Sequence, residues 1–278
     1  MKASTSLIFK LYLRLQSIKA FYRWLTRSNH VLSNPAADID LPKLEKRLPR
    51  DILTISEVEQ VLSVPDVTTP LGLRDRAILE TLYSTGMRRG ELLGLRLTDL
   101  NPETGVIMIR LGKGKKDRVL PIGERALAWL RKYITDARPQ LVVEPDDGAI
   151  FLAYNGTPLI DGSLGEVVRN LILDSKVGKR GSCHLFRHTM ATHMLEGGAD
   201  IRFIQQMLGH AQLTTTEIYT QVSIRKLREI LATHPGARLK RRAGTESPEG
   251  DETEEAREEL FSTLAVEEEE EETNSPKR

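Results

Sequence analysis

The sequence predicts a mostly α-helical protein that carries a small antiparallel β-sheet, an α+β fold. Apolar residues recur at spacings of three and four over most of the chain, which is the period of an amphipathic helix. One region departs from this pattern, because two β-branched runs at 106–109 and 118–122 flank the charged turn GKGKKD (112–117). Two such runs on either side of a glycine-containing turn are typical of a β-hairpin.

The overall composition narrows the class of protein. The chain has 278 residues, of which 40% are hydrophobic, and a single cysteine, Cys183. A lone cysteine excludes an intramolecular disulfide framework and fits a reducing compartment. No run approaches the roughly 18 consecutive apolar residues of a membrane-spanning helix, and Lys10 and Arg14 interrupt the N-terminal stretch, unlike a signal peptide. We therefore expect a cytoplasmic protein that makes no contact with a membrane.

The formal net charge of +1 averages two unlike regions. Residues 241–278 hold 14 acidic and 5 basic residues, which leaves 25 acidic and 35 basic residues in the rest of the chain. This basic body predicts a polyanionic partner, although basic residues also serve simply to solvate a surface. The acidic tail at 241–278 is predicted to be disordered, because it cannot bury enough apolar surface. Its one apolar island, LFSTLAV at 260–266, is expected to have no docking role.

Residues 1–37 are predicted to form a small helical unit. The apolar pattern predicts a helix over 7–32, and Asn34-Pro35 ends it. The aromatic residues of this helix, such as Phe21 and Trp24, are expected to be core, although a basic helix with aromatic residues could also lie on DNA.

A larger unit is predicted over 53–240, after a basic linker at 38–52 that two prolines stiffen. Local signals mark its elements, such as the capping box Thr54-x-x-Glu57 and the helix-ending Gly86. In order, we expect a helix from residue 55, helices at 74–83 and 91–95, strands at 106–109 and 118–122, a helix at 124–133, a strand at 149–152 and a helix at 163–174.

The last part of this unit is predicted to be helical as well. Ser182 is a suitable N-cap for a helix over 184–196, and Gly209 ends a short helix that Asp200 opens. Thr214-x-x-Glu217 is a second capping box, so Tyr219 is expected in the early turns of the following helix. Helix is then expected to continue over 223–232.

Several residues of the larger unit match the demands of cleaving a phosphodiester without a metal. A tyrosine can attack phosphorus and conserve the bond energy in a covalent adduct. Arginines bind two non-bridging oxygens at once and stay charged. A lysine on a flexible turn can deliver a proton to the leaving oxygen. The chain offers candidates for these roles in Arg88 after a helix end, His184 and Arg187 three apart on one helix, His210 in a loop, and Tyr219 nine residues later. Lys113, between two glycines of the 112–117 turn, is the candidate lysine, although such a charged turn can also serve only for solubility.

A metal site is the rival interpretation of the histidines. His184 and His188 are four apart, which is a metal-ligand spacing on a helix, and His193 lies nearby. The segment lacks the glutamate of an HExxH motif, and no third ligand is evident. We therefore predict no metal site, and expect His188 and His193 to have structural roles.

Five motifs then occur in a fixed order: TGMRRGELLGL (85–95), GKGKKDR (112–118), HLFRH (184–188), LGH (208–210) and TTTEIYT (214–220). In these motifs the chain resembles the tyrosine recombinase family, which comprises the phage-integrase and Xer-type site-specific recombinases. The resemblance runs from about Leu53 to about His234. It implies a tyrosine-recombinase catalytic domain over 53–240, preceded by a partial helical core-binding, DNA-binding domain over 1–37.

The resemblance also implies a role for each site residue. Arg88 and Arg187 clamp the scissile phosphate, Lys113 is the general acid, His184 and His210 assist proton transfer and stabilise the transition state, and Tyr219 is the nucleophile that forms a 3′-phosphotyrosyl link. Members of the family use no metal, ATP or other cofactor for this chemistry. They usually work as tetramers on two double-stranded DNA sites, and residues 223–233 match the segment that contacts a neighbouring subunit.

The expected function is therefore site-specific DNA recombination, for integration, excision or resolution, by an enzyme bound to DNA of the nucleoid. The alternatives are a catalytically inactive DNA-binding derivative and a type IB topoisomerase-like activity. Two departures from the family pattern bear on this expectation. Cys183 stands where the family often has proline, and only LQSIKAFYRWL (15–25) followed by NPA matches the N-terminal domain.

Overall fold

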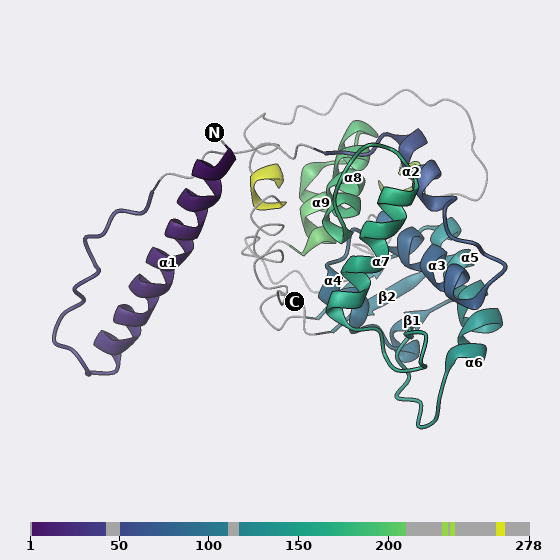
Figure 1. Cartoon of the computed structure of the whole chain (residues 1–278), viewed down its shortest axis with the longest axis horizontal. Helices are drawn as coiled ribbons and strands as arrows, with labels where there is room; N and C mark the ends of the chain where they lie inside the picture. Colours follow the sequence, from purple (N-terminus) through teal and green to yellow (C-terminus); the bar gives the residue numbers. More distant parts are fainter. Residues whose placement is uncertain are drawn as a thin grey trace. The chain divides into compact units, whose positions relative to one another are not determined.

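The computed structural model describes residues 2–42, 51–110, 117–209, 230–232, 234–236 and 260–264, with the side chains of 2–10 and 13 left out. The chain divides into two units, Met1–Arg47 and Leu48–Arg278, and the division falls within the segment predicted to be a linker. The elements are α1 (Lys2–Arg27), α2 (Ile55–Leu62), α3 (Pro70–Thr85), α4 (Arg89–Leu93), η1 (Leu97–Asp99), β1 (Leu100–Asn101), β2 (Val106–Ile109), β3 (Arg118–Pro121), α5 (Glu124–Lys132), η2 (Tyr133–Ala137), α6 (Arg138–Leu141), α7 (Asp161–Asp174), α8 (Cys183–Glu196) and α9 (Ile201–Leu208) (Figure 1). None of the described helices is long and apolar enough to cross a membrane.

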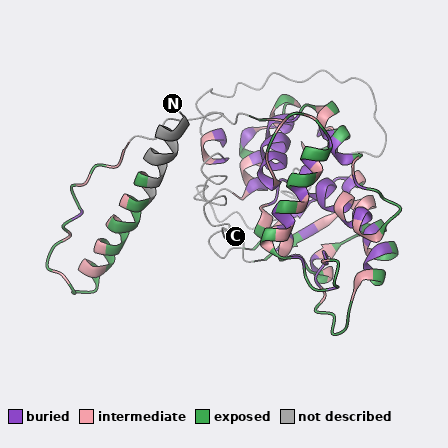
Figure 2. Ribbon diagram, viewed as in Figure 1, coloured by how far each residue is buried: buried purple, intermediate pink, exposed green. Residues whose placement is uncertain are grey.

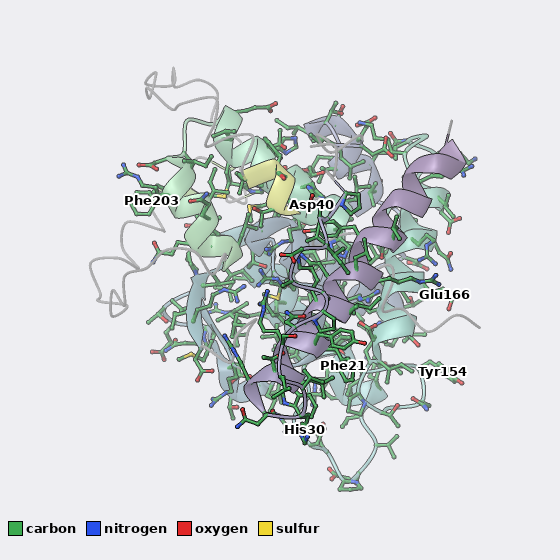
Figure 3. The ribbon with its side chains drawn as sticks, turned by 90° about the vertical axis from the view of Figure 1, so that its left-hand side faces the viewer. Phe21, His30, Asp40, Tyr154, Glu166 and Phe203 are labelled. Carbon is green, nitrogen blue, oxygen red and sulfur yellow. The ribbon has the colours of Figure 1, made fainter. Side chains whose placement is uncertain are left out.

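The first unit consists of α1 and a segment that returns beside it. Lys19 Nζ donates hydrogen bonds to the carbonyl oxygens of Ala37 and Ile39, at 3.0 and 2.6 Å. Phe21 and Trp24 stack with their ring centroids 6.4 Å apart, yet they are 55% and 56% exposed. Figure 2 shows exposed residues along much of α1, and Figure 3 labels Phe21 on this helix. The prediction that these aromatic residues are core is therefore wrong for this unit. The reason is that α1 is the unit's one helix in its described residues, so no second apolar layer covers it.

The second unit is built around α3, which is buried over most of its length. This helix packs against α5 and α8, and α8 in turn packs against α9 (Figure 1). Figure 2 shows that α8 is also buried almost throughout. Two buried helices side by side explain why neither shows a strong amphipathic pattern, since both of their faces meet protein.

A three-stranded antiparallel sheet lies in this unit, in the order β1-β2-β3. The register pairs Ile107 with Leu120 and Ile109 with Arg118, which confirms the predicted hairpin. The strand expected at 149–152 is wrong: Ala149 and Leu152 form only isolated bridges, to Arg96 and Pro158. Both bridging partners lie outside the named strands, so no continuous ladder forms.

The helix ends largely follow the predicted local signals. The Thr54 capping box forms, with Glu57 N donating to Thr54 Oγ1 at 3.2 Å and Thr54 N donating to Glu57 Oε2 at 2.7 Å. Gly86 and Gly209 end α3 and α9 in the left-handed conformation. Ser182 occupies the N-cap position of α8 but makes no side-chain capping bond, and its backbone, with φ −146° and ψ −139°, lacks the usual N-cap conformation. Its hydroxyl donates instead to the Gly165 carbonyl of α7 at 2.9 Å.

The end of α3 gives the first prediction. Gly86 has a φ of +58°, and a Cβ at this position would lie 2.1 Å from Met190 Cε. We expect Gly86→Ala to lower the free energy of unfolding by about 2–4 kcal/mol, from left-handed strain and overpacking together. Chemical unfolding measures the change. Gly148→Ala is the matched control, since Gly148 also has a positive φ, +79°, but has no atom within 4 Å of the added Cβ. Equal losses in the two variants would contradict the packing argument.

His234 is joined to α3 and α8 through a buried cluster of aromatic rings. The ring of His234 lies 4.4 Å from that of Tyr83, and its Nδ1 accepts a hydrogen bond from Gly236 N at 3.2 Å. The hydroxyl of Tyr83 bonds to His193 Nδ1 at 2.8 Å. His193 thus has the structural role predicted for it.

This cluster makes stability depend on pH. Burial, with the nearby His193 and Arg125, lowers the pKa of His234 to about 3. Between pH values of about 3 and 6.5, this histidine is protonated in the unfolded chain but not in the folded protein. The free energy of unfolding therefore rises with pH in this window. We expect His234→Gln to reduce the slope of unfolding free energy against pH by about 1.4 kcal/mol per unit in this window. Urea unfolding between pH 4 and 7 tests this, with the exposed His30→Gln as control. An unchanged slope in His234→Gln would show that His234 is not the source of the pH dependence.

The apolar island of the acidic tail is a further correction. Residues 260–264 are helical, and Leu260, Phe261 and Leu264 are buried within the hydrophobic core of the second unit (Figure 1, yellow). Residues at i, i+1 and i+4 fall within one apolar face of a helix, about 100° wide, which explains how three apolar side chains are buried together. The expectation of a tail without order or docking therefore fails for this segment, and the rest of 241–278 lies outside the described residues.

Candidate active site

Arg187 lies at the centre of the candidate site. It projects from α8 and is only 2% exposed. Its Nη1 donates to the carbonyl of Gly86 at 2.5 Å, and its Nη2 donates to the carbonyl of Leu208 at 2.9 Å. One guanidinium group therefore ties the turn after α3 to the last turn of α9, two segments more than a hundred residues apart in sequence.

Arg88 bonds to the adjoining residue of the same turn. It follows the Gly86 turn and directly precedes α4, with an extended backbone. Its Nη2 donates to the carbonyl of Gly209 at 3.3 Å. Since Leu208 and Gly209 are consecutive, the two arginines bind neighbouring carbonyl groups of one turn. The structure thus brings together two side chains that the sequence places 99 positions apart.

Glu91 holds Arg88 and was not identified from the sequence. Its Oε1 accepts from Arg88 Nη1 at 3.1 Å, and its Oε2 accepts from Arg88 N at 2.8 Å. Arg118 donates to both oxygens. Burial favours the neutral acid, but the hydrogen bonds and charges of Arg118 and Arg88 outweigh it and hold the pKa of Glu91 below its usual range. The signal that could have revealed Glu91 is its spacing, three residues after Arg88 at the start of a helix.

The remaining predicted site residues divide into two groups. His184 is buried on α8, one turn before Arg187 and on the same face. Lys113, His210 and Tyr219 lie outside the described residues, as does the capping box that begins at Thr214. The structure does describe residues that flank two of these positions. They are β2 and β3, on either side of the lysine turn, and Gly209, directly before His210.

The other two histidines of α8 are His188 and His193. His188 is buried, and His193 bonds to Tyr83 as described above. Within the described ranges, no three His, Cys, Asp or Glu side chains are grouped as metal ligands would be.

The arrangement places two permanently charged donor groups beside one turn. Two guanidinium groups beside one turn can bind the oxygens of a tetrahedral anion in a fixed geometry and remain charged at any physiological pH. Such donors stabilise the negative charge that accumulates on phosphorus-bound oxygens during phosphoryl transfer. Paired arginines of this kind suit a phosphate ligand, which is the class of site that the sequence motifs predict.

Comparison with known proteins identifies the family. Residues 51–225 match the model of the phage integrase family. The chain therefore belongs to the phage integrase family, and the fold expected from the motifs is confirmed.

Several relatives are similar over most of this chain. It is 53% identical over 228 residues to tyrosine recombinase XerC 2 of Ralstonia nicotianae, which covers 82% of this chain and 65% of the relative. It is 38% identical over 216 residues to tyrosine recombinase XerD of Staphylococcus haemolyticus, covering 78% and 72%. The chain thus spans a little under two thirds of the first relative's length.

Solved structures agree with this assignment. The crystal structure of XerA recombinase superposes with a TM-score of 0.53 at 27% identity, covering 78% of this chain and 74% of that one. The crystal structure of a XerH site-specific recombinase bound to its difH substrate in a pre-cleavage complex has a TM-score of 0.52 at 28% identity. The match covers 69% of this chain and 55% of that one.

Proposed function

We propose that this protein is a site-specific DNA recombinase that cleaves and rejoins DNA strands through a 3′-phosphotyrosyl intermediate. The observation that carries the proposal is the convergence of Arg88 and Arg187 on the turn that directly precedes His210. Family membership and the identity to recombinases named XerC and XerD support it.

In this proposal each site residue has one role. Arg88 and Arg187 bind the non-bridging oxygens of the scissile phosphate, and Lys113 protonates the leaving 5′ oxygen. His184 and His210 assist proton transfer and stabilise the transition state. Tyr219 attacks phosphorus and keeps the strand's 3′ end attached to the protein until a free 5′ hydroxyl displaces it. No cofactor or metal enters these steps.

The other tyrosines support Tyr219 as the nucleophile. The chain has six tyrosines. Burial raises the pKa of Tyr83 strongly and that of Tyr133 to about 12, which makes both poor sources of phenolate. Tyr12 and Tyr22 belong to α1, and Tyr154 projects from a loop of the second unit at 81% exposure (Figure 3). Of the six tyrosines, Tyr219 alone lies soon after the turn at Leu208 and Gly209, whose carbonyl groups Arg187 and Arg88 bind.

The proposed partner is double-stranded DNA that carries a recombination site, bound by a tetramer of this chain or of this chain with a relative. The basic excess of residues 1–240 suits such a polyanion. Support also comes from the XerH recombinase, whose structure holds its DNA substrate. We propose that the protein acts in the cytoplasm on DNA of the nucleoid. The non-catalytic and topoisomerase-like alternatives gain no support from these relatives.

Covalent capture tests the function and finds the DNA site in the same experiment. The full-length protein is incubated with lightly nicked genomic fragments from its own host, because a nick beside a cleavage site releases the 5′ end and blocks rejoining. Protein-linked DNA is recovered after denaturation in SDS and sequenced. We expect linkage through the 3′ end of the strand, concentrated at one or a few sites. DNA bound only non-covalently, or linkage spread evenly over the genome, would contradict the proposal.

A further inference from the structure

Arg118 is a buried cation outside the residues assigned to the reaction. The sequence suggests that it closes a solvent-exposed, charged hairpin turn, GKGKKDR (112–118). The structure instead places it at the first position of β3, opposite Ile109, with only 6% of the residue exposed. An arginine is rarely buried to this extent unless a partner compensates its charge.

That partner is Glu91. Arg118 Nη1 donates to Glu91 Oε1 at 2.6 Å, and Nη2 donates to Oε2 at 2.7 Å, a two-pronged pairing that fixes the carboxylate plane. Arg118 Nε meets no acceptor in the described part of the chain, so the carboxylate is the anchor of this side chain. Each oxygen of Glu91 therefore receives one hydrogen bond from Arg118 and one from Arg88.

Arg118 also touches the turn that leads to His210. A Cβ added to Gly209 would lie 2.7 Å from Arg118 Cζ and 2.8 Å from its Nη1, so the guanidinium group packs directly against this glycine. The carbonyl of Gly209 accepts the hydrogen bond of Arg88. One side chain thus contacts both the carboxylate that holds Arg88 and the residue that Arg88 binds.

The charges of this group point to a role. Arg88 and Arg118 share one buried carboxylate, so the three side chains carry a net charge of +1. If Arg118 were neutral, Glu91 would cancel the charge of Arg88 and compete with an incoming phosphate for its hydrogen bonds. With Arg118 present, the charge of Glu91 is already compensated, and Arg88 keeps a positive charge for the phosphate.

We infer that Arg118 is a positioning residue for strand cleavage, which neutralises Glu91 so that the guanidinium group of Arg88 is held in place and stays available to the scissile phosphate. This inference rests on the proposed function. Arg118 acts through Glu91 and Gly209 and needs no contact with DNA.

Two substrates separate this role from a loss of folding. Both are synthetic nicked duplexes of a sequence recovered by the covalent capture described above. The first has an ordinary scissile phosphate. In the second, a methyl group replaces one non-bridging oxygen, so the scissile methylphosphonate is uncharged and depends less on a correctly charged arginine.

The main variant is Arg118→Gln, and the rate of adduct formation is measured at saturating protein. We expect it to cleave the phosphate about tenfold or more slowly than wild type, and the methylphosphonate within about threefold of wild type. Arg118→Lys preserves the charge and should fall between Arg118→Gln and wild type on the phosphate. The same comparison of substrates can be made with Arg118→Lys alone if Arg118→Gln does not fold.

The matched control is Arg138→Gln. Arg138 is also buried, at 5% exposure, and also pairs through both terminal nitrogens with one carboxylate, Asp146, at 2.7 and 2.9 Å. The variant Arg138→Gln should be destabilised like Arg118→Gln but should cleave both substrates at the wild-type rate. The inference would be overturned if the Arg118 variants cleaved the phosphate at the wild-type rate, or if their cleavage rate fell by the same factor on both substrates. A wild-type protein that forms no adduct would overturn the proposed function itself, and that failure is visible before any variant is made.

Discussion

Tyr219→Phe is expected to abolish the covalent adduct between protein and DNA while leaving DNA binding within about twofold of wild type. The substitution removes one oxygen atom, the atom proposed to attack phosphorus, and no other side chain of the site can replace it. Arginine and lysine are protonated before the attack and therefore have no lone pair to offer to phosphorus. The measurement is SDS-resistant protein–DNA complex on a nicked duplex, with binding followed in parallel by gel retardation.

Tyr154→Phe serves as the matched control for this result. It removes the same atom from an exposed tyrosine in a loop of the same unit. The control variant should form adduct at the wild-type rate. Adduct formation by Tyr219→Phe at the wild-type yield would show that another residue is the nucleophile and would reject the proposed mechanism.

Arg187→Lys is expected to have the second largest effect, slowing strand cleavage by about 10²–10³ even when the site is saturated with DNA. The ammonium group of lysine cannot bind two oxygens in one plane as the guanidinium group does. The variant should also lose about 2–4 kcal/mol of unfolding free energy, because the buried carbonyls of Gly86 and Leu208 lose donors. Single-turnover cleavage and urea unfolding measure the two effects separately.

Arg138→Lys distinguishes the catalytic from the structural part of this effect. Arg138 is buried, binds the carbonyl of Ala149 through Nε at 2.9 Å and pairs with Asp146. Its substitution should therefore cost a similar amount of stability without slowing cleavage. If Arg187→Lys were as active as Arg138→Lys, Arg187 would be a structural residue and the phosphate clamp would have to be sought elsewhere.

Much of the local structure could be predicted because its causes are local. Each of three predicted features depends on residues a few positions apart. They are the Thr54 capping box, the left-handed glycines that end α3 and α9, and the paired strands β2 and β3. The failures were at sites where distant residues decide. Ser182 bonds to α7 instead of its own helix, and the run at 149–152 finds no strand to pair with. Apolar residues at 260–264 looked isolated because the core that buries them is far away in the sequence.

The candidate site shows the same division. The order of the motifs and the chemistry of arginine, lysine, histidine and tyrosine were sufficient to nominate Arg88 and Arg187, since their side chains suit a phosphate wherever they lie. Local sequence gave no indication of Arg118, and for Glu91 it offered only the spacing of three residues after Arg88. A glutamate after an arginine and an arginine after a lysine-rich turn are ordinary surface patterns, and most such charges are solvated.

The sequence by itself therefore determined the family, the mostly helical fold with its hairpin, and the identity of the groups suited to the chemistry. The tertiary structure alone decided which charges are removed from water and which of them share a partner. The physical reason is that burial is a property of the whole packed unit. Only when α4, β3 and the Gly209 turn meet do Arg88 and Arg118 share one carboxylate, and that sharing leaves the three side chains with a net charge of +1.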